Sequence, residues 1–150
     1  MVLTREMIIQ KLNEQIFALM VTQSKTGMSS RTMMFAYKPE NSIFMLTHKG
    51  TLKLDDIKNS PVGLVHISAL ENDLIQSYDI SMSGTFEIIN DGSPLYQDGR
   101  EYLGKKNNQI RDILKSESGK QYEMLLFHIT SLSGWSYYQI VNGQPKTYVI

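Results

Sequence analysis

The stretch "IFALMVTQSKTGMSSRTMMFAYKPENSIFMLT", residues 16–47, decides the fold. It contains three short apolar runs, residues 16–23, 31–38 and 43–47, each of a length typical of a β-strand. Turn-forming segments separate the runs, because "SKTGMS" contains Gly27 and "KPENS" contains a proline. The pattern predicts a β-hairpin followed by a third strand.

The flanking sequence extends this prediction to a mostly β protein. Thr4 is expected to cap a first helix, and a second helix is expected from Thr51 to about residue 59, ended by Pro61. Further strands are predicted at residues 62–67, 79–89 and 122–130, with a bend, bulge or close backbone approach at Gly84. Residues 93–119 show a helical pattern, and their polarity indicates that this segment lies on the surface of the protein. "WSYYQIV" and "KTYVI" are expected to add aromatic-rich β-structure, which gives a closed or nearly closed β-barrel with peripheral helices.

Composition excludes several functional classes. The 150 residues suit a single domain, residues 1–150, and the balance of 15 basic and 15 acidic side chains argues against a nucleic-acid partner. Cysteine is absent, which excludes disulfides, zinc–thiolate sites and cysteine nucleophiles. The N-terminal segment is interrupted by charges every few residues and resembles neither a signal peptide nor a membrane span. We therefore expect a cytoplasmic protein with no membrane partner.

The turn "THKGTLK", residues 47–53, carries the first candidate site. Gly50 allows close approach of a ligand to the backbone, and a helix start offers unpaired N–H groups to an anion. Thr51 adds a hydroxyl and Lys53 a positive charge, and Arg31 joins them if the strands pair as predicted. The same residues also fit a plain helix N-cap with a solvated lysine, so both interpretations stay open at this point.

The order of these segments resembles the pyridoxamine 5′-phosphate oxidase-like superfamily of FMN-binding split β-barrels, with the closer resemblance to its general-stress-protein branch. The similarity runs from about Thr4 to Trp135 and depends most on the strand "RTMMF", the turn "GTLK" and the late tryptophan. It implies a six-stranded antiparallel barrel of Greek-key type. It also implies a homodimer with FMN at the subunit interface and a small-molecule redox substrate.

The resemblance assigns a role to each matching position. It places Arg31 near the flavin phosphate, with Thr32 and Met33 presenting backbone to the ring. The strand end at Leu46 and Thr47 would face the isoalloxazine. In the phosphate turn Thr51 and Lys53 match the family's serine and lysine, and Trp135 matches a tryptophan that approaches the flavin from the partner subunit. These eight residues form the predicted cofactor site.

The chain departs from the true pyridoxamine phosphate oxidases at several positions. Leu52 replaces the arginine in the centre of the phosphate turn, Ala36 replaces a lysine, and Asp79 stands where those enzymes have a flavin-contacting glutamine. The tail after Trp135 also lacks the arginine and histidine that bind the substrate phosphate. The resemblance therefore implies an FMN-dependent oxidoreductase that acts on another substrate, for which the sequence identifies no catalytic residue.

A second hypothesis is a flavin-binding protein without turnover, serving as a sensor, carrier or store. Related barrels hold deazaflavin or haem, so the pocket could take another planar cofactor. The three histidines, His48, His66 and His128, fit structural or ligand-contacting roles better than a metal site, and no metal is expected.

Overall fold

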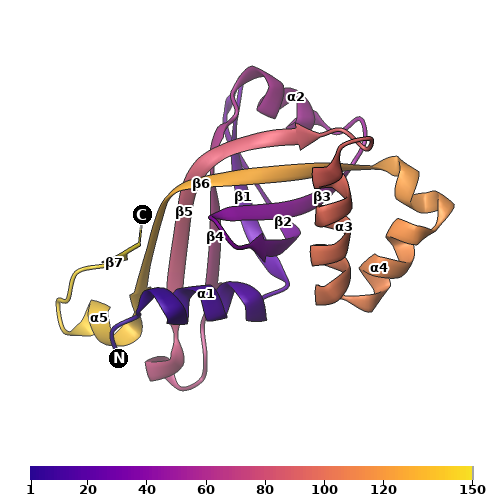
Figure 1. The fold of residues 1–150 in the computed structure, drawn as a ribbon. Coiled ribbons are helices and arrows are strands. Elements are labelled where there is room, and N and C mark those ends of the chain that lie inside the picture. Colours follow the sequence, from indigo (N-terminus) through magenta and orange to yellow (C-terminus); the bar gives the residue numbers. More distant parts are fainter. Residues whose placement is uncertain (150) are drawn as a thin grey trace.

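The computed structural model describes residues 1–149, and its core is a closed six-stranded antiparallel β-barrel (Figure 1). The strands are β1 (Phe17–Ser24), β2 (Gly27–Lys38), β3 (Ser42–His48), β4 (Val62–Ala69), β5 (Tyr78–Ile89) and β6 (Tyr122–Ser136). They follow the order β3-β2-β1-β4-β5-β6, and pairing of β3 with β6 closes the barrel. A short β7 (Thr147–Tyr148) adds to the far end of β6. The predicted β-barrel with peripheral helices is confirmed.

Within residues 1–149, five helices and two 3-10 turns surround the barrel. The helices are α1 (Arg5–Glu14), α2 (Leu52–Asn59), α3 (Pro94–Lys106), α4 (Asn108–Lys115) and α5 (Tyr137–Val141), and the 3-10 turns are η1 (Leu74–Gln76) and η2 (Glu117–Gln121). Thr4 caps α1 as predicted, because its hydroxyl accepts from the backbone N–H of Met7 at 3.2 Å. Figure 1 places α2 at one end of the barrel, and α5 with η1 at the other. Among the described residues, no helix is both long and apolar enough to cross a bilayer.

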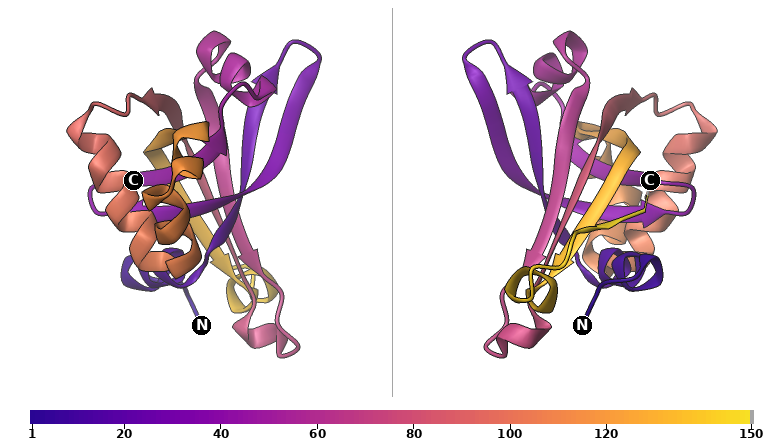
Figure 2. Two further views of the ribbon diagram at one scale, coloured as in Figure 1. Left: turned by 90° about the vertical axis from the view of Figure 1, so that its right-hand side faces the viewer. Right: turned by 90° about the vertical axis from the view of Figure 1, so that its left-hand side faces the viewer.

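Strand β3 separates two apolar clusters because both of its faces are buried. Ile43 and Met45 point into the barrel, where Phe35, Phe127 and the α1 residues Ile8 and Leu12 also lie. Phe44 and Leu46 point to the other side and pack with α3 and α4 residues, including Leu103, Ile110 and Leu114. Helices α3 and α4 are therefore held against the barrel by a small apolar core of their own. Figure 2 shows the two helices beside the barrel strands.

A break in the β5–β6 register lies at Gly84, as the sequence predicts. The pairing shifts between Ser83 and Gly84, and any side chain at position 84 would collide with the backbone carbonyl of His128. Only glycine allows the two long strands to approach so closely there, which helps them curve around the barrel.

Three predicted boundaries need correction. Strand β2 begins at Gly27, so Arg31 lies within the strand and not at its start. Strand β6 continues to Ser136, past the predicted end at residue 130. The segment "SYYQIV", expected to be β-structure, contains helix α5, because Ser136 and Gln139 form a reciprocal capping box that starts a helix there. The helical pattern of residues 93–119 is confirmed, and it is divided among α3, α4 and η2, since Asn107 ends α3 and caps α4.

Candidate functional site

The turn between β3 and α2 has a left-handed backbone conformation at Gly50, for which glycine is well suited. Gly50 has a φ of +74°, in the left-handed region that glycine adopts without strain. Apart from Gly50 itself and its two chain neighbours, no atom of the described residues lies within 4 Å of the place where a Cβ would be, so space adjoins the turn. The turn is anchored on the other side by the N–H of Lys49, which donates to the carbonyl of Gln121 at 2.8 Å.

Two threonine hydroxyls at this turn are buried without a partner. Thr51 occupies the N-cap position of α2, yet its side chain makes no capping hydrogen bond. The Oγ1 atoms of Thr51 and Thr47 are both buried and unpaired within the described chain. The plain N-cap interpretation therefore fails at Thr51. A buried hydroxyl without a partner costs about 1–3 kcal/mol, so a polar ligand atom reaching these oxygens would be stabilised.

Two positive side chains meet beside the same turn. The ammonium of Lys53 lies 3.4 Å from the thioether sulfur of Met33, and Met33 and Arg31 project from the same side of β2. Burial lowers the pKa of Lys53, and the positive charge of Arg31 lowers that pKa further. Within residues 1–149, neither cation forms an ion pair with a carboxylate. Like charges brought together without a counter-charge favour a bound anion.

Arg31 lines a hollow of about 570 Å³ between α2 and the β1–β2 hairpin. Figure 2 shows the hairpin standing apart from the other strands at this end of the barrel, beside α2. Leu52, 80% exposed, also lines the hollow and contributes no charge where the resembling family has arginine. The lining also contains the carboxylates of Asp55 and Asp56 and two further cations, Lys25 and Lys58, so the hollow carries charges of both signs.

The remaining predicted residues of the β2 and β3 strands lie on different faces. Met33 is buried, and Thr32, its neighbour, is exposed on the opposite face of β2. Leu46 is nearly buried in the cluster under α3 and α4, whereas Thr47 follows it on the other face of β3. The structure thus brings Arg31, Met33, Thr47, Thr51 and Lys53 to one end of the barrel. The side chains of Thr32 and Leu46 point elsewhere.

Trp135 is far from this turn within one chain. Tyr122, which pairs with His48 beside the turn, and Trp135 lie at opposite ends of β6. Figure 1 shows the same separation, since α2 and α5 occupy opposite ends of the molecule. The indole lines a separate hollow of about 330 Å³ with His66, Asp79, Ser81, Ile140 and Lys146. Only a second subunit could bring a Trp135 to the turn.

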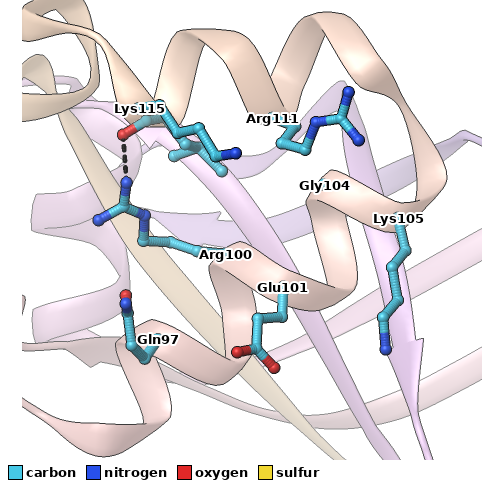
Figure 3. Close-up of a pocket in the computed structure, with 8 residues that line it drawn as sticks. Gln97, Arg100, Glu101, Gly104, Lys105, Arg111 and Lys115 are labelled. Atoms are coloured by element: carbon cyan, nitrogen blue, oxygen red, sulfur yellow. Dashed lines mark hydrogen bonds between the residues drawn. The ribbon is translucent and has the colours of Figure 1, made fainter.

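A basic hollow between α3 and α4 was not predicted from the sequence, because its lining combines side chains from both helices. Its volume is about 310 Å³, and its lining includes Arg100, Lys105, Arg111 and Lys115 (Figure 3). Arg100 donates to the carbonyl of Leu114 at 2.6 Å. Figure 3 shows Arg100 reaching the end of α4, whereas Lys105 and Arg111 point away from it. The four cations do not converge on one point.

Lys106, at the end of α3, is a second partly buried cation. Its ammonium donates to the carbonyls of Leu12, at 2.8 Å, and Gln15, and it lies 4.0 Å from the centre of the Phe35 ring. Burial lowers the pKa of Lys106 to about 8. These contacts fasten the end of α3 to the C-terminal end of α1, where carbonyl groups lack helical partners.

Comparison with solved structures identifies the architecture. The chain aligns with a candidate pyridoxamine 5′-phosphate oxidase from Listeria innocua over 85% of its own length and 94% of that chain, with 14% identity and a TM-score of 0.65. General Stress Protein 26 from Bacillus anthracis matches over 96% and 97% of the two chains, with 17% identity and a TM-score of 0.65. This protein has the fold of the pyridoxamine 5′-phosphate oxidase-like split barrels.

A further split barrel with a different described role is similar in structure. HutZ, a haem storage protein from Vibrio cholerae, matches over 88% of this chain and 94% of its own, with 14% identity and a TM-score of 0.71. No protein-family model and no curated protein matches the chain. Identities this low establish a shared split-barrel fold, which confirms the resemblance inferred from sequence at that level, and leave the ligand to be argued from the residues.

Proposed function

We propose that this split barrel binds FMN through its phosphate at the turn between β3 and α2 and acts as a flavin-dependent oxidoreductase. The observation that carries the proposal is the pair of cations, Arg31 and Lys53, which form no ion pair within the described residues and lie beside two unpaired hydroxyls. A phosphate monoester carries about −1.5 to −2 charges and three acceptor oxygens, which matches this set.

The residues at the turn have distinct roles in this proposal. Lys53 and Arg31 neutralise the phosphate, Thr51 and Thr47 donate their hydroxyls, and Gly50 lets the backbone approach. Bound FMN would supply the two-electron redox chemistry, while the protein orients the ring and excludes water. Backbone groups of Thr32, Met33 and Leu46 would contact the ring, as the family resemblance implies.

The proposal includes a homodimer that completes the site with Trp135 of a second copy. The outer face of β1 and β4 supports this assembly, because Phe17, Leu19 and Val62 are all exposed there. We expect Trp135→Ala to change the fluorescence of bound flavin and to leave the dimer intact in gel filtration. An unchanged flavin spectrum in this variant would contradict the placement of Trp135.

Retention of the cofactor tests the proposal directly. Protein purified with added FMN is expected to be yellow and to keep its flavin absorbance through gel filtration. Reduction by NADH or NADPH, followed by reoxidation with an added acceptor, would then distinguish an oxidoreductase from a protein that only binds flavin. Colourless protein after FMN loading would refute the flavin assignment.

A haem-binding carrier or store, or a binder of deazaflavin, is the second candidate function. The likeness to HutZ favours it, together with the exposed His48, which lies directly after Thr47 with its ring 4.4 Å from that of Tyr122. An imidazole at this position could bind iron. A Soret band that survives gel filtration after addition of haemin, with no retention of FMN, would favour this candidate.

A further inference from the structure

The outer face of the barrel carries a polar array that the phosphate turn does not use. His66 on β4 and Ser81 on β5 are directly paired across the sheet, and Asp79 lies on the same face two residues from Ser81. The Nδ1 atom of His66 lies 3.0 Å from the Ser81 hydroxyl, and its Nε2 lies 3.3 Å from Oδ1 of Asp79. Both ring nitrogens are thus engaged and the imidazole is fixed in orientation.

This array forms one wall of the hollow of about 330 Å³ that Trp135 lines. Trp135 is the cross-strand partner of Asp79, so the indole stands directly beside the carboxylate. The size of the hollow falls at the lower end of the range of small-molecule sites. Ile140 from α5 supplies an apolar contact.

The lining of the hollow also includes a positive side chain, Lys146. The ammonium of Lys146 lies 5.2 Å from the centre of the Trp135 ring. In the described part of the chain, Lys146 has no carboxylate within 4 Å. The side chain of Asp79 is 51% exposed, and only its Oδ1 oxygen is engaged, by His66. A cation without a carboxylate partner and a carboxylate with a free oxygen therefore both lie beside the Trp135 side chain.

We propose that this hollow binds a small aromatic acid that also carries a hydrogen-bond donor, of the hydroxybenzoate or aminobenzoate type. The ring of such a compound would lie against Trp135, its carboxylate would pair with Lys146, and its hydroxyl or amino group would donate to Asp79. His66 and Ser81 hold Asp79 in place and are positioning residues. The assignment of this hollow as the substrate site rests on the proposed flavoprotein function, whereas binding itself does not.

The single tryptophan of the chain makes the test specific. In a ¹H–¹⁵N correlation spectrum of the labelled protein without added FMN, the one indole N–H signal reports on the surroundings of Trp135. Titration with 4-hydroxybenzoate is expected to shift that signal saturably. Lys146→Gln and Asp79→Asn are each expected to weaken binding about tenfold, the usual effect of losing one charged hydrogen bond. Lys120→Gln, which changes an exposed lysine on η2, serves as the matched control and should leave the affinity unchanged.

Two ligand analogues test the same contacts without any substitution. The neutral 4-hydroxybenzamide lacks the carboxylate and benzoate lacks the donor, so both should bind more weakly than 4-hydroxybenzoate. The absence of a saturable shift, or equal affinities for all three compounds, would overturn the proposal. A parallel FMN titration separates the two hypotheses, because FMN binding without hydroxybenzoate binding refutes only this inference, and the converse result refutes only the flavin assignment.

Discussion

The ammonium of Lys53 lies 3.4 Å from the sulfur of Met33, so a side chain of α2 reaches across to the strand that carries Arg31. A thioether is a weak acceptor and gives a cation little compensation for lost hydration. The charge of Lys53 is therefore held in a partly buried place by the fold rather than by a counter-ion. A phosphate would replace this weak contact with a strong one.

Removal of this ammonium tests the phosphate turn. Lys53→Ala is expected to weaken FMN binding about tenfold or more, because one charged contact is lost. Flavin fluorescence titration would measure the change. Lys115→Ala, which changes an exposed lysine at the C-terminal end of α4 and outside this hollow, is the control and should change FMN affinity much less. Equal affinities for the wild type and Lys53→Ala would remove Lys53 from the site.

The unpaired hydroxyls give a second test with an internal control. Thr51→Val keeps the shape of the side chain and removes a buried hydroxyl that has no partner. We expect the ligand-free protein to gain about 1 kcal/mol in its free energy of unfolding, while FMN affinity falls. Thr22→Val removes another buried, unpaired hydroxyl, on β1. Thr22→Val should give a similar gain in the free energy of unfolding, measured by urea denaturation, and no change in FMN affinity. If the two variants had the same affinity for FMN, Thr51 would have no role in binding it.

Residue 52 offers a gain-of-function test. Leu52 is 80% exposed and lines the hollow that Arg31 also lines, so a long side chain has room there. Leu52→Arg is expected to tighten FMN binding about tenfold by adding a planar donor for the phosphate. Leu52→Gln, similar in length but uncharged, should have little effect. If FMN is bound elsewhere, the two variants will have the same affinity.

Much of the fold could be predicted from the sequence because most strands alternate or form short apolar runs between clear turns. Helix α5 could not, since Tyr137, Tyr138 and Ile140 favour strands while the deciding capping box depends on a side-chain contact between Ser136 and Gln139. The phosphate turn could be predicted because its residues are close in sequence. The hollow at Trp135 could not, because it is assembled from β4, β5, β6, α5 and the tail. The relation of Trp135 to the turn remains a prediction, as it requires two chains.

The contact between Lys106 and α1 predicts a pH dependence of stability. The pKa of this amine falls from an unperturbed value of 10.5 to about 8 on folding, so between these values the unfolded chain binds more protons than the folded one. The contribution of Lys106 to the free energy of unfolding should therefore increase as the pH rises from about 8 to about 10.5. Lys106→Met keeps the length of the side chain and cannot titrate, and subtracting its stability at each pH cancels the other alkaline groups.

Urea denaturation of the wild type and Lys106→Met at several pH values between 7 and 10.5 would measure this difference. We expect the wild type to gain stability relative to the variant across that interval, because the cost of burying the charged ammonium disappears as the amine loses its proton. Lys105→Met, at the adjacent exposed position of α3, should show no such trend. If the difference between wild type and Lys106→Met were constant with pH, the amine would titrate alike in both states, and its contacts with Leu12, Gln15 and Phe35 would fully offset its burial.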